Sequence, residues 1–302
     1  MTAAPVDTVS RVRPLADRIR DYIELTKPSI TRMCLITTGG GFWLASPPET
    51  GTQWWTMMCA LLGTALAVGA ANALNMWWER APDQRMTRTK DRPLASGRLR
   101  PQNALVFGLA LGFSGMVVLG AGTNLLTALL GAFALLSYVL VYTPLKYRTP
   151  LALVVGAVPG AMPPLMGWTA ATDGLGAAGL VLFGTLLLWQ MPHFLAISVY
   201  RKRDYANAGI QIVPVVRGDR VATRQAIAWA TALLPLSLML TPLGVTGTLY
   251  FVVALVSGSA FLLMTIAGLW AQNTHRWARK VFIGSLIHLP LLTLALALDV
   301  VI

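Results

Sequence analysis

The sequence predicts an all-α protein that crosses a membrane nine times. Of its 302 residues, 55% are hydrophobic and only 12% are charged, and the mean hydropathy is +0.62, which lies outside the usual range of soluble globular domains. Apolar runs of about 20 residues, the length at which a helix spans a bilayer, recur along the whole chain. They lie near 29 to 46, 54 to 77, 103 to 122, 124 to 143, 150 to 170, 177 to 199, 225 to 245, 247 to 270 and 280 to 299.

The basic residues predict the orientation of these helices, because Lys and Arg stay on the cytoplasmic side during insertion. With the N-terminus inside, all 24 of them fall in the N-terminal arm, in the loops after the second, fourth, sixth and eighth helices, or at adjoining helix ends. The opposite side then holds Glu49, Asp173 and Asp299 and no base. We therefore expect a cytoplasmic N-terminus and an outer C-terminus. Anionic lipids and an anionic substrate explain the net charge of +12 without nucleic acid.

Residues 1 to 28 are predicted to form a cytoplasmic arm, and residues 29 to 302 the membrane domain. The arm lacks the apolar core of a signal peptide, and its acidic residues argue against a transit peptide. Leu15, Ile19, Tyr22 and Ile23 recur at helical spacing, which predicts an amphipathic helix lying on the inner membrane surface. For residues 1 to 12 a disordered tail is an equal alternative.

The end of the second helix and the loop after it carry the most informative polar pattern. Asn72, Asn75, Glu79 and Asp83 follow one another in steps of three or four, so their oxygens line one helical face. Cations follow directly, at Arg85, Arg88, Lys90 and Arg92. Hard oxygen ligands beside a cluster of cations suit a magnesium-bound polyphosphate. The alternative, a basic loop that only orients the helices, leaves the acidic face unexplained.

The next two inner loops add further candidates. The short loop after the fourth helix, YTPLKYRTP, places Tyr142, Lys146 and Arg148 at the membrane edge. The long loop after the sixth helix holds Asp204 among several cations, and Arg217 further on. Surrounding cations keep a carboxylate ionised, so Asp204 either binds a second metal or pairs structurally with arginine.

Inside the membrane, the fifth helix contains GAVPGAMPPLMGW, which starts at Gly156. Its glycines and prolines predict that this helix is interrupted or kinked and forms the wall of a pocket. His193 and His288 each lie eight residues from a base at the inner surface, at a depth of about 12 Å, so we expect them to share that pocket. Each is either a functional group or a hydrogen-bonded packing residue.

These residues carry a resemblance. The pattern N-x-x-x-E-x-x-x-D-x-x-M-x-R-T-x-x-R-P at 75 to 93 is similar to the first aspartate-rich motif of the UbiA-type intramembrane prenyltransferases. YTPLKYRT, VPGAMPPLMGW, WQMPHF and DYANAGI resemble the branch of that superfamily that farnesylates haem. The similarity spans the second to ninth helices. Where many members have a second D-x-x-x-D, this chain has Tyr200 four residues before Asp204.

The resemblance implies nine helices around a cavity open to the cytoplasmic side. Asn75, Glu79 and Asp83 would hold Mg²⁺ on farnesyl diphosphate, with Asp204 as a further metal ligand. The acceptor would be a vinyl group of haem b, and the products would be haem O, after addition of water, and diphosphate. The residues expected to act in catalysis are Asn75, Glu79, Asp83, Arg88, Arg92, Lys146, His193 and His288. Those expected to bind substrate are Asn72, Arg85, Tyr142, Arg148, Tyr200, Asp204 and Arg217.

His193 or His288 would either ligate the haem iron or take the proton from the water. The resemblance also implies a bacterial inner membrane, contact with its lipids, and association with a haem A synthase or a terminal oxidase assembly. Two other functions remain open from the residues alone. One is a UbiA-type enzyme for an aromatic quinone precursor, and the other is a secondary transporter, since broken helices and intramembrane polar groups also mark transport paths.

Overall fold

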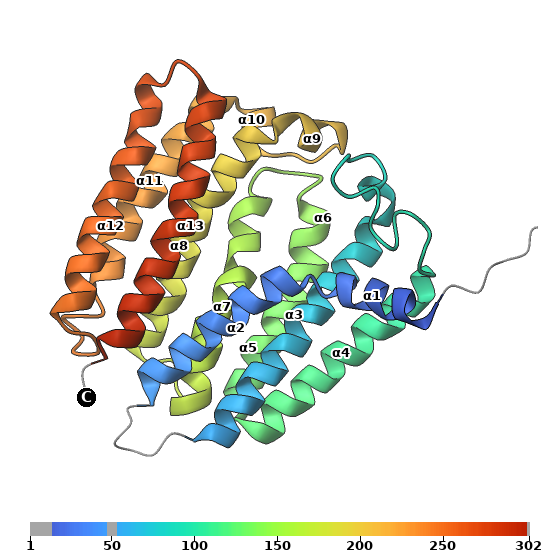
Figure 1. Cartoon of the computed structure of the whole chain (residues 1–302), viewed down its shortest axis with the longest axis horizontal. Coiled ribbons are helices and arrows are strands. Elements are labelled where there is room, and N and C mark those ends of the chain that lie inside the picture. The colour runs from blue at the N-terminus through green and yellow to red at the C-terminus, as the bar shows by residue number, and fades with distance from the viewer. Residues whose placement is uncertain (1–13, 47–52, 301–302) are drawn as a thin grey trace, which may run out of the picture.

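The computed structural model describes residues 14–46 and 53–300, which form helices joined by turns (Figure 1). Residues 1 to 12 of the predicted arm and Glu49 lie outside the described ranges. The elements in chain order are α1 (Leu15–Leu25), α2 (Pro28–Ala45), α3 (Trp54–Asp83), α4 (Pro101–Gly122), α5 (Leu125–Leu136), η2 (Ser137–Tyr142), α6 (Thr143–Leu145), α7 (Ala152–Thr172), α8 (Ala177–Tyr200), α9 (Lys202–Asn207), α10 (Val213–Val216), α11 (Asp219–Leu238), α12 (Thr248–Ile266), η3 (Ala267–Trp270) and α13 (Thr274–Leu298).

Each predicted membrane segment lies on one of the longer helical stretches. Among the described residues, seven of these stretches are long and apolar enough to cross a membrane. The other two predicted segments lie on α2 and α11. Arg32 and a run of threonine and glycine make α2 less apolar, and α11 begins with a charged turn. The all-helical membrane fold is confirmed, while nine crossings and their orientation stay predictions.

Glycines bring α2 and α7 into close contact. A Cβ atom built on Gly167 would overlap the carbonyl oxygen of Thr38, and one built on Gly41 would overlap the carbonyl oxygen of Pro164. Small residues at such a crossing let two backbones approach, which is how helices gain packing energy where lipid removes the hydrophobic drive. The α2–α7 pair therefore forms a closely packed wall of the cavity that is described below.

The fifth membrane helix was predicted to be interrupted or kinked, and the interruption is not found. α7 runs unbroken from Ala152 to Thr172, although Pro159, Pro163 and Pro164 remove backbone donors from its interior. The helix is packed against α2, α3, α5 and α8, and in the described part of the chain it is the most buried of the seven apolar helices. Such protein contacts are what allow proline inside a membrane helix.

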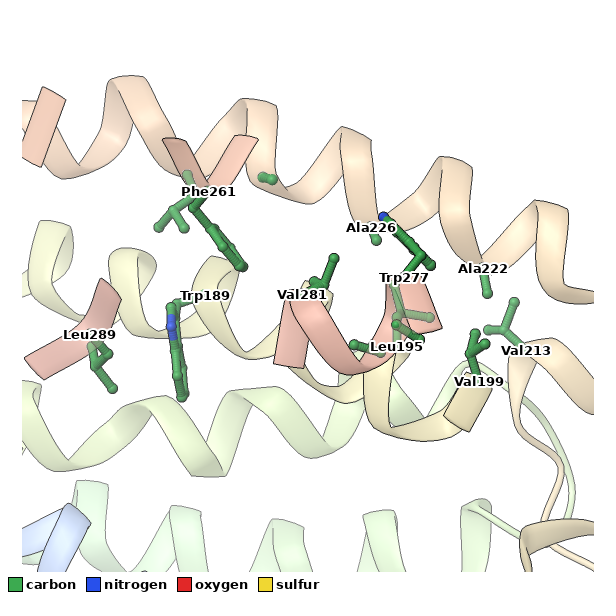
Figure 2. Packing of buried hydrophobic residues seen from close by; sticks show 14 of the residues in the cluster. Trp189, Leu195, Val199, Val213, Ala222, Ala226, Phe261, Trp277, Val281 and Leu289 are labelled. Atoms are coloured by element: carbon green, nitrogen blue, oxygen red, sulfur yellow. The ribbon is translucent and has the colours of Figure 1, made fainter. Parts of the chain in front are cut away.

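The C-terminal helices form a second packed group. α8, α11, α12 and α13 share one hydrophobic cluster, in which Ala222 and Ala226 of α11 face the side chains of Val199 and Trp277 (Figure 2). The small alanines let α11 lie close to α8. This packing fixes the other faces of α8 and α13, which line the cavity described below.

α1 is a short helix beside the membrane bundle, next to the loop that follows α3 (Figure 1). It exposes Leu15, Ile19 and Ile23, at 70%, 51% and 53% of their surface, and buries Asp21. Arg98 of the loop donates to Asp21 at 3.0 Å, so the helix is tied to the protein by its polar side. These are three of the four residues that the sequence predicts to contact the membrane surface. The fourth, Tyr22, packs instead on the ring of Phe107 in α4, with centroids 5.0 Å apart.

Candidate active site

A cavity of about 890 Å³ lies between α2, α3, η2, α7, α8 and α13. This volume is near the upper end of the range of small-molecule sites, roughly 300–1,000 Å³. One end is polar and lies beneath the loops after α3, α6 and α9. The deeper part is mostly apolar. The cavity therefore suits an amphiphile with an anionic head and a long hydrocarbon tail. Its polar end is lined by Lys27, Asn72, Asn75, Glu79, Asp83, Arg88, Arg92, Lys146, Tyr147, Tyr205 and Gln211, and its deeper part includes Met33, Thr37, Val68, Leu135, Met162 and Met166.

The predicted polar face of α3 points into this cavity. Asn72, Asn75, Glu79 and Asp83 all line it, and each is at most 5% exposed. Buried carboxylates and amides need partners. The prediction that these side chains share one face is confirmed. Three of the four are paired with cations that could otherwise bind an anion, while the Asn72 amide donates to the carbonyl of Thr26 at 3.3 Å.

The three side chains paired with cations are Glu79, Asp83 and Asn75. Lys146 contacts the carboxylate of Glu79, to which the Tyr147 hydroxyl also donates at 3.1 Å. One guanidinium nitrogen of Arg92 lies 2.9 and 2.8 Å from the two carboxylate oxygens of Asp83. The side chain of Asn75 accepts from Lys27 Nζ at 3.2 Å.

The donor set fits Mg²⁺ bound together with a diphosphate. Within the described ranges no three His, Cys, Asp or Glu side chains form a metal cluster. The α3 face offers two carboxylates, Glu79 and Asp83, and two amides, Asn72 and Asn75. Mg²⁺ usually takes one or two carboxylates and completes its octahedral shell with water and substrate phosphate. Glu79, Asp83 and Asn75 could supply the protein's share of that shell, and the cations that now pair with them would be free to bind the phosphate oxygens.

Burial perturbs both lysines. It lowers the pKa of Lys27 to about 7, with the charge of Arg92 acting in the same direction and that of Asp83 opposing it. It also lowers the pKa of Lys146 to about 7, with Lys27 adding to the effect, while the contact with Glu79 favours the charged form. An anionic ligand would stabilise the charged form of both lysines, so the polar end of the cavity favours binding of an anion.

A π-helical turn positions the next part of the site. Over η2 the amide of Thr143 donates to the carbonyl of Tyr138, five residues back, and Pro144 has no amide to continue the α-helical pattern. The Thr143 hydroxyl then lies 3.1 Å from the Asn75 amide nitrogen, from which it accepts. Such turns frequently mark functional sites. Here the turn brings Tyr142 and Lys146 to the cavity.

Glycines on α7 make room for the cavity wall. A Cβ on Gly156 would meet the ring of Tyr142 at 2.5 Å, and one on Gly160 would overlap the side chain of Gln190. Pro159 and Pro163 line the cavity with them. The prediction that this stretch forms a pocket wall is confirmed.

The two intramembrane histidines do not lie together. His193 lines the cavity, with Nδ1 2.7 Å from the hydroxyl of Ser285 on α13. His288 faces α12 instead, where Nδ1 lies 3.0 Å from the Ser257 hydroxyl and its ring stacks on Phe261. The prediction of a shared cavity is wrong for His288. Equal depth fixes the height of a residue on a helix but not its direction around the axis.

Three loops close over the polar end. Met86, Ala208 and Ile210 form a small cluster with Tyr147 and Tyr205 packed against it, and the amide of Gln211 donates to the Lys146 carbonyl at 2.9 Å. Apolar contacts above the charged groups limit the access of water to them.

Comparison with known proteins identifies this arrangement. The model of the UbiA prenyltransferase family matches residues 34–286, which is most of the chain. The chain belongs to the UbiA prenyltransferase family. Within this family it is 47% identical over 290 residues to a protoheme IX farnesyltransferase of Myxococcus xanthus, covering 96% of this chain and 98% of the relative. It is 48% identical over 300 residues to the protein of that name from Anaeromyxobacter dehalogenans, covering 99% of this chain and 100% of the relative.

Solved UbiA structures share the fold at low identity. A structure of digeranylgeranylglyceryl phosphate synthase aligns with a TM-score of 0.79 at 17% identity, covering 93% of this chain and 98% of that one. A UbiA homolog from Archaeoglobus fulgidus bound to GPP and Mg²⁺ aligns with a TM-score of 0.67 at 15% identity, covering 92% and 99%. The helical arrangement is therefore that of the UbiA fold.

Several predicted residues lie away from the UbiA cavity. Arg85 and Arg148 are exposed and do not line it. Arg217 lines only a separate pocket of about 30 Å³. Tyr200 packs beneath the Arg201 guanidinium, 4.8 Å from ring centroid to carbon. Tyr200 also packs against Phe282, with ring centroids 5.9 Å apart. The predicted substrate contacts of these four residues are not supported.

The proposed second metal ligand is also not supported. Asp204 lies outside the cavity lining and its carboxylate is 3.6 Å from the Arg201 guanidinium, one helical turn earlier. Of the two readings of this acid, the structure favours the ion pair with arginine. Its neighbour Tyr205 is the residue of α9 that reaches the cavity.

Sequence reasoning missed Lys27, Tyr147, Trp189 and Gln190, all of which line the cavity. Lys27 has a positive φ of 47° between α1 and α2, and this turn directs its side chain inward. A lysine directly before the proline that starts a membrane helix is a signal that could have marked it. The aromatic and amide residues of α8 are not distinguishable by type from ordinary packing groups.

Proposed function

We propose that the protein transfers the farnesyl group of farnesyl diphosphate to a vinyl group of protohaem IX, with addition of water, giving haem O and diphosphate. The observation that carries this proposal is the polarity of the cavity, which has cations and oxygen ligands at one end and is apolar along its depth. In addition, 96% of the chain aligns at 47% identity with a protein named protoheme IX farnesyltransferase. Neither a transporter nor an aromatic acceptor accounts for that similarity.

The polar end would hold the diphosphate. Lys27, Lys146, Arg88 and Arg92 can bind its oxygens, since charge-assisted hydrogen bonds to phosphate are strong. We propose that Asn75, Glu79 and Asp83 hold Mg²⁺, as the donor set fits and as a UbiA homolog has been solved with GPP and Mg²⁺. When bound, Mg²⁺ would supply positive charge to stabilise the leaving diphosphate.

The reaction then requires little covalent work from the protein. As the allylic carbon–oxygen bond breaks, its electron pair stays on the diphosphate, where the ammonium and guanidinium groups stabilise it. The vinyl π electrons form the new carbon–carbon bond, and the resulting cation next to the porphyrin is captured by water, which loses a proton. The loops over the polar end limit competing hydrolysis of the farnesyl cation.

The setting of the enzyme follows from the same features. We propose that it lies in a bacterial inner membrane with its N-terminus in the cytoplasm and its C-terminus outside, and that the exposed stripe of α1 rests on lipid headgroups. Delivery of a hydrophobic haem product favours contact with the haem A synthase or terminal oxidase assembly that uses it.

The test uses purified protein in detergent with radiolabelled farnesyl diphosphate, haem b and Mg²⁺. A labelled pigment heavier than haem b by one farnesyl group plus one water supports the proposal. Asp83→Asn and a reaction without Mg²⁺ are the controls, and both should give no product. Label transferred to an aromatic acid but not to haem b would contradict it in favour of a quinone-precursor enzyme.

A further inference from the structure

We propose that His193 binds the iron of the acceptor haem through Nε2, and that Ser285 holds the imidazole in the tautomer that allows it. This deepens the proposed function and rests on it, because haem b is the acceptor there. The two residues come from neighbouring helices, α8 and α13.

The hydrogen bonds of Ser285 determine the tautomer. Its hydroxyl lies 2.6 Å from the carbonyl oxygen of Phe282 and 2.7 Å from Nδ1 of His193, but it has only one hydrogen to donate. If that hydrogen went to Nδ1, two oxygens would face each other at 2.6 Å with no hydrogen between them. The hydroxyl therefore donates to the carbonyl and accepts from Nδ1–H. The neutral ring then carries an unprotonated Nε2.

Aromatic contacts fix the ring's orientation. The Trp189 ring stacks on His193, with centroids 4.9 Å apart and planes 21° from parallel, and Phe282 lies 5.1 Å away at 37°. The indole of Trp189 also donates to the Ser285 carbonyl at 3.0 Å, which ties the stacking residue to the helix that holds Nδ1. His193 lines the cavity although it is only 9% exposed, so the edge that remains for a ligand is the one with Nε2.

The surroundings of His193 favour a role as a ligand of the haem iron over a role as a proton acceptor. In the described part of the chain, the hydrogen bonds and ring contacts of His193 are to one hydroxyl and three aromatic rings. A protonated imidazole would be a buried charge without a counterion, which is costly. Binding iron leaves the imidazole neutral, and an Nδ1–H held by a second residue is the usual arrangement for a metal-bound histidine.

The cavity beside this edge suits a porphyrin. Phe194, Ile197 and Leu286 line it on the side of α8 and α13, and Gly156 and Gly160 line it on α7. Tyr142 and Gln190 pack against these two glycines, and the apolar side chains of this part of the cavity leave room for a flat macrocycle whose iron faces His193. His288 offers a natural contrast, because it is also an intramembrane histidine held by a serine, but it faces α12.

The test compares haem binding in matched variants of the purified full chain. The wild-type protein should bind haem b with the absorption and EPR spectra of a histidine-ligated iron. His193→Ala should lose that signature and weaken haem b binding at least tenfold, and added imidazole should restore the spectrum. Its affinity for metal-free protoporphyrin IX, which keeps the vinyl groups, should be unchanged. Ser285→Ala should keep the ligand but weaken haem b binding by about 10–100-fold.

His288→Ala is the control, and it should keep the wild-type spectrum and affinity. A spectrum that survives His193→Ala would overturn the inference, as would an equal loss of affinity for haem b and for metal-free protoporphyrin. Farnesyl diphosphate binding in the same preparations reports that the variants are folded. Failure of the wild type to form haem O refutes the proposed function, whereas haem O formation with a spectrum insensitive to His193 refutes only the role of this residue.

Discussion

Lys27 is predicted to take up a proton when farnesyl diphosphate binds. Burial and Arg92 lower its pKa to about 7 in the ligand-free protein, so at pH 8 most of these side chains are neutral. A bound diphosphate restores the charged form. Binding should therefore take up about 0.9 proton at this residue at pH 8 and about 0.1 at pH 6. Below pH 7 the lysine is already charged, and above it each pH unit weakens affinity by up to about tenfold.

Lys27→Arg isolates this effect, because a guanidinium stays charged at every accessible pH. Titration calorimetry at pH 8 in two buffers of different ionisation heat counts the protons taken up. The wild type should exceed the variant by about 0.9 proton, and ionisation of the ligand cancels in the difference. Lys90→Arg, an exposed lysine of the loop after α3, should match the wild type. Equal proton counts for wild type and Lys27→Arg would refute a neutral Lys27 in the empty site.

Three further predictions concern the metal site, the packing and the topology. Asp83→Asn should abolish turnover, because it removes a charge needed to bind Mg²⁺, and size-exclusion chromatography should show that the variant is folded. Near-normal activity at saturating Mg²⁺ would exclude Asp83 as a ligand. Gly167→Ala should destabilise the protein by about 1–3 kcal/mol, because its Cβ would overlap a carbonyl of α2. Gly40→Ala is the control and should leave the melting temperature nearly unchanged, since the nearest atom to its Cβ would be 4.0 Å away. Cysteines at the exposed Gln84 and Gln102 should react only with reagents that reach the cytoplasm, and labelling of intact cells from outside would reverse the topology.

The sequence was most informative where one helix carries the whole pattern. The spacing of Asn75, Glu79 and Asp83 was enough to place their side chains on one face, because 3.6 residues per turn determines that face without knowledge of any neighbour. The apolar runs likewise predicted the helices, since bilayer thickness sets their length. Both expectations depend only on local geometry.

Expectations that depended on direction between helices were less successful. The depth of His288 was calculated from its distance along α13, but whether it faces the cavity or α12 depends on how α13 packs. Asp204 was a candidate ligand by its type and surroundings, yet the turn at Arg201 directs it outward. The glycines and prolines of α7 predicted an interruption or a kink, and contacts with the neighbouring helices keep α7 continuous. Lys27 enters the site from a turn outside the membrane segments, where no periodic pattern applies.

The π-helical turn between α5 and α6 restricts which changes in chain length this region can accept. The turn Ser137–Tyr142 holds about one residue more than a regular α-helical turn would, so closing it can absorb the loss of one residue. Deleting one residue from the regular part of α5 would instead rotate everything before the deletion by about 100° relative to everything after it. Thr143 could then no longer meet Asn75 while the lipid-facing residues of α5 kept their places. Homologous chains should therefore vary freely in the side chains on the outer face of α5 but not in the number of residues between Asn124, which caps that helix, and Ser137, where the wide turn begins.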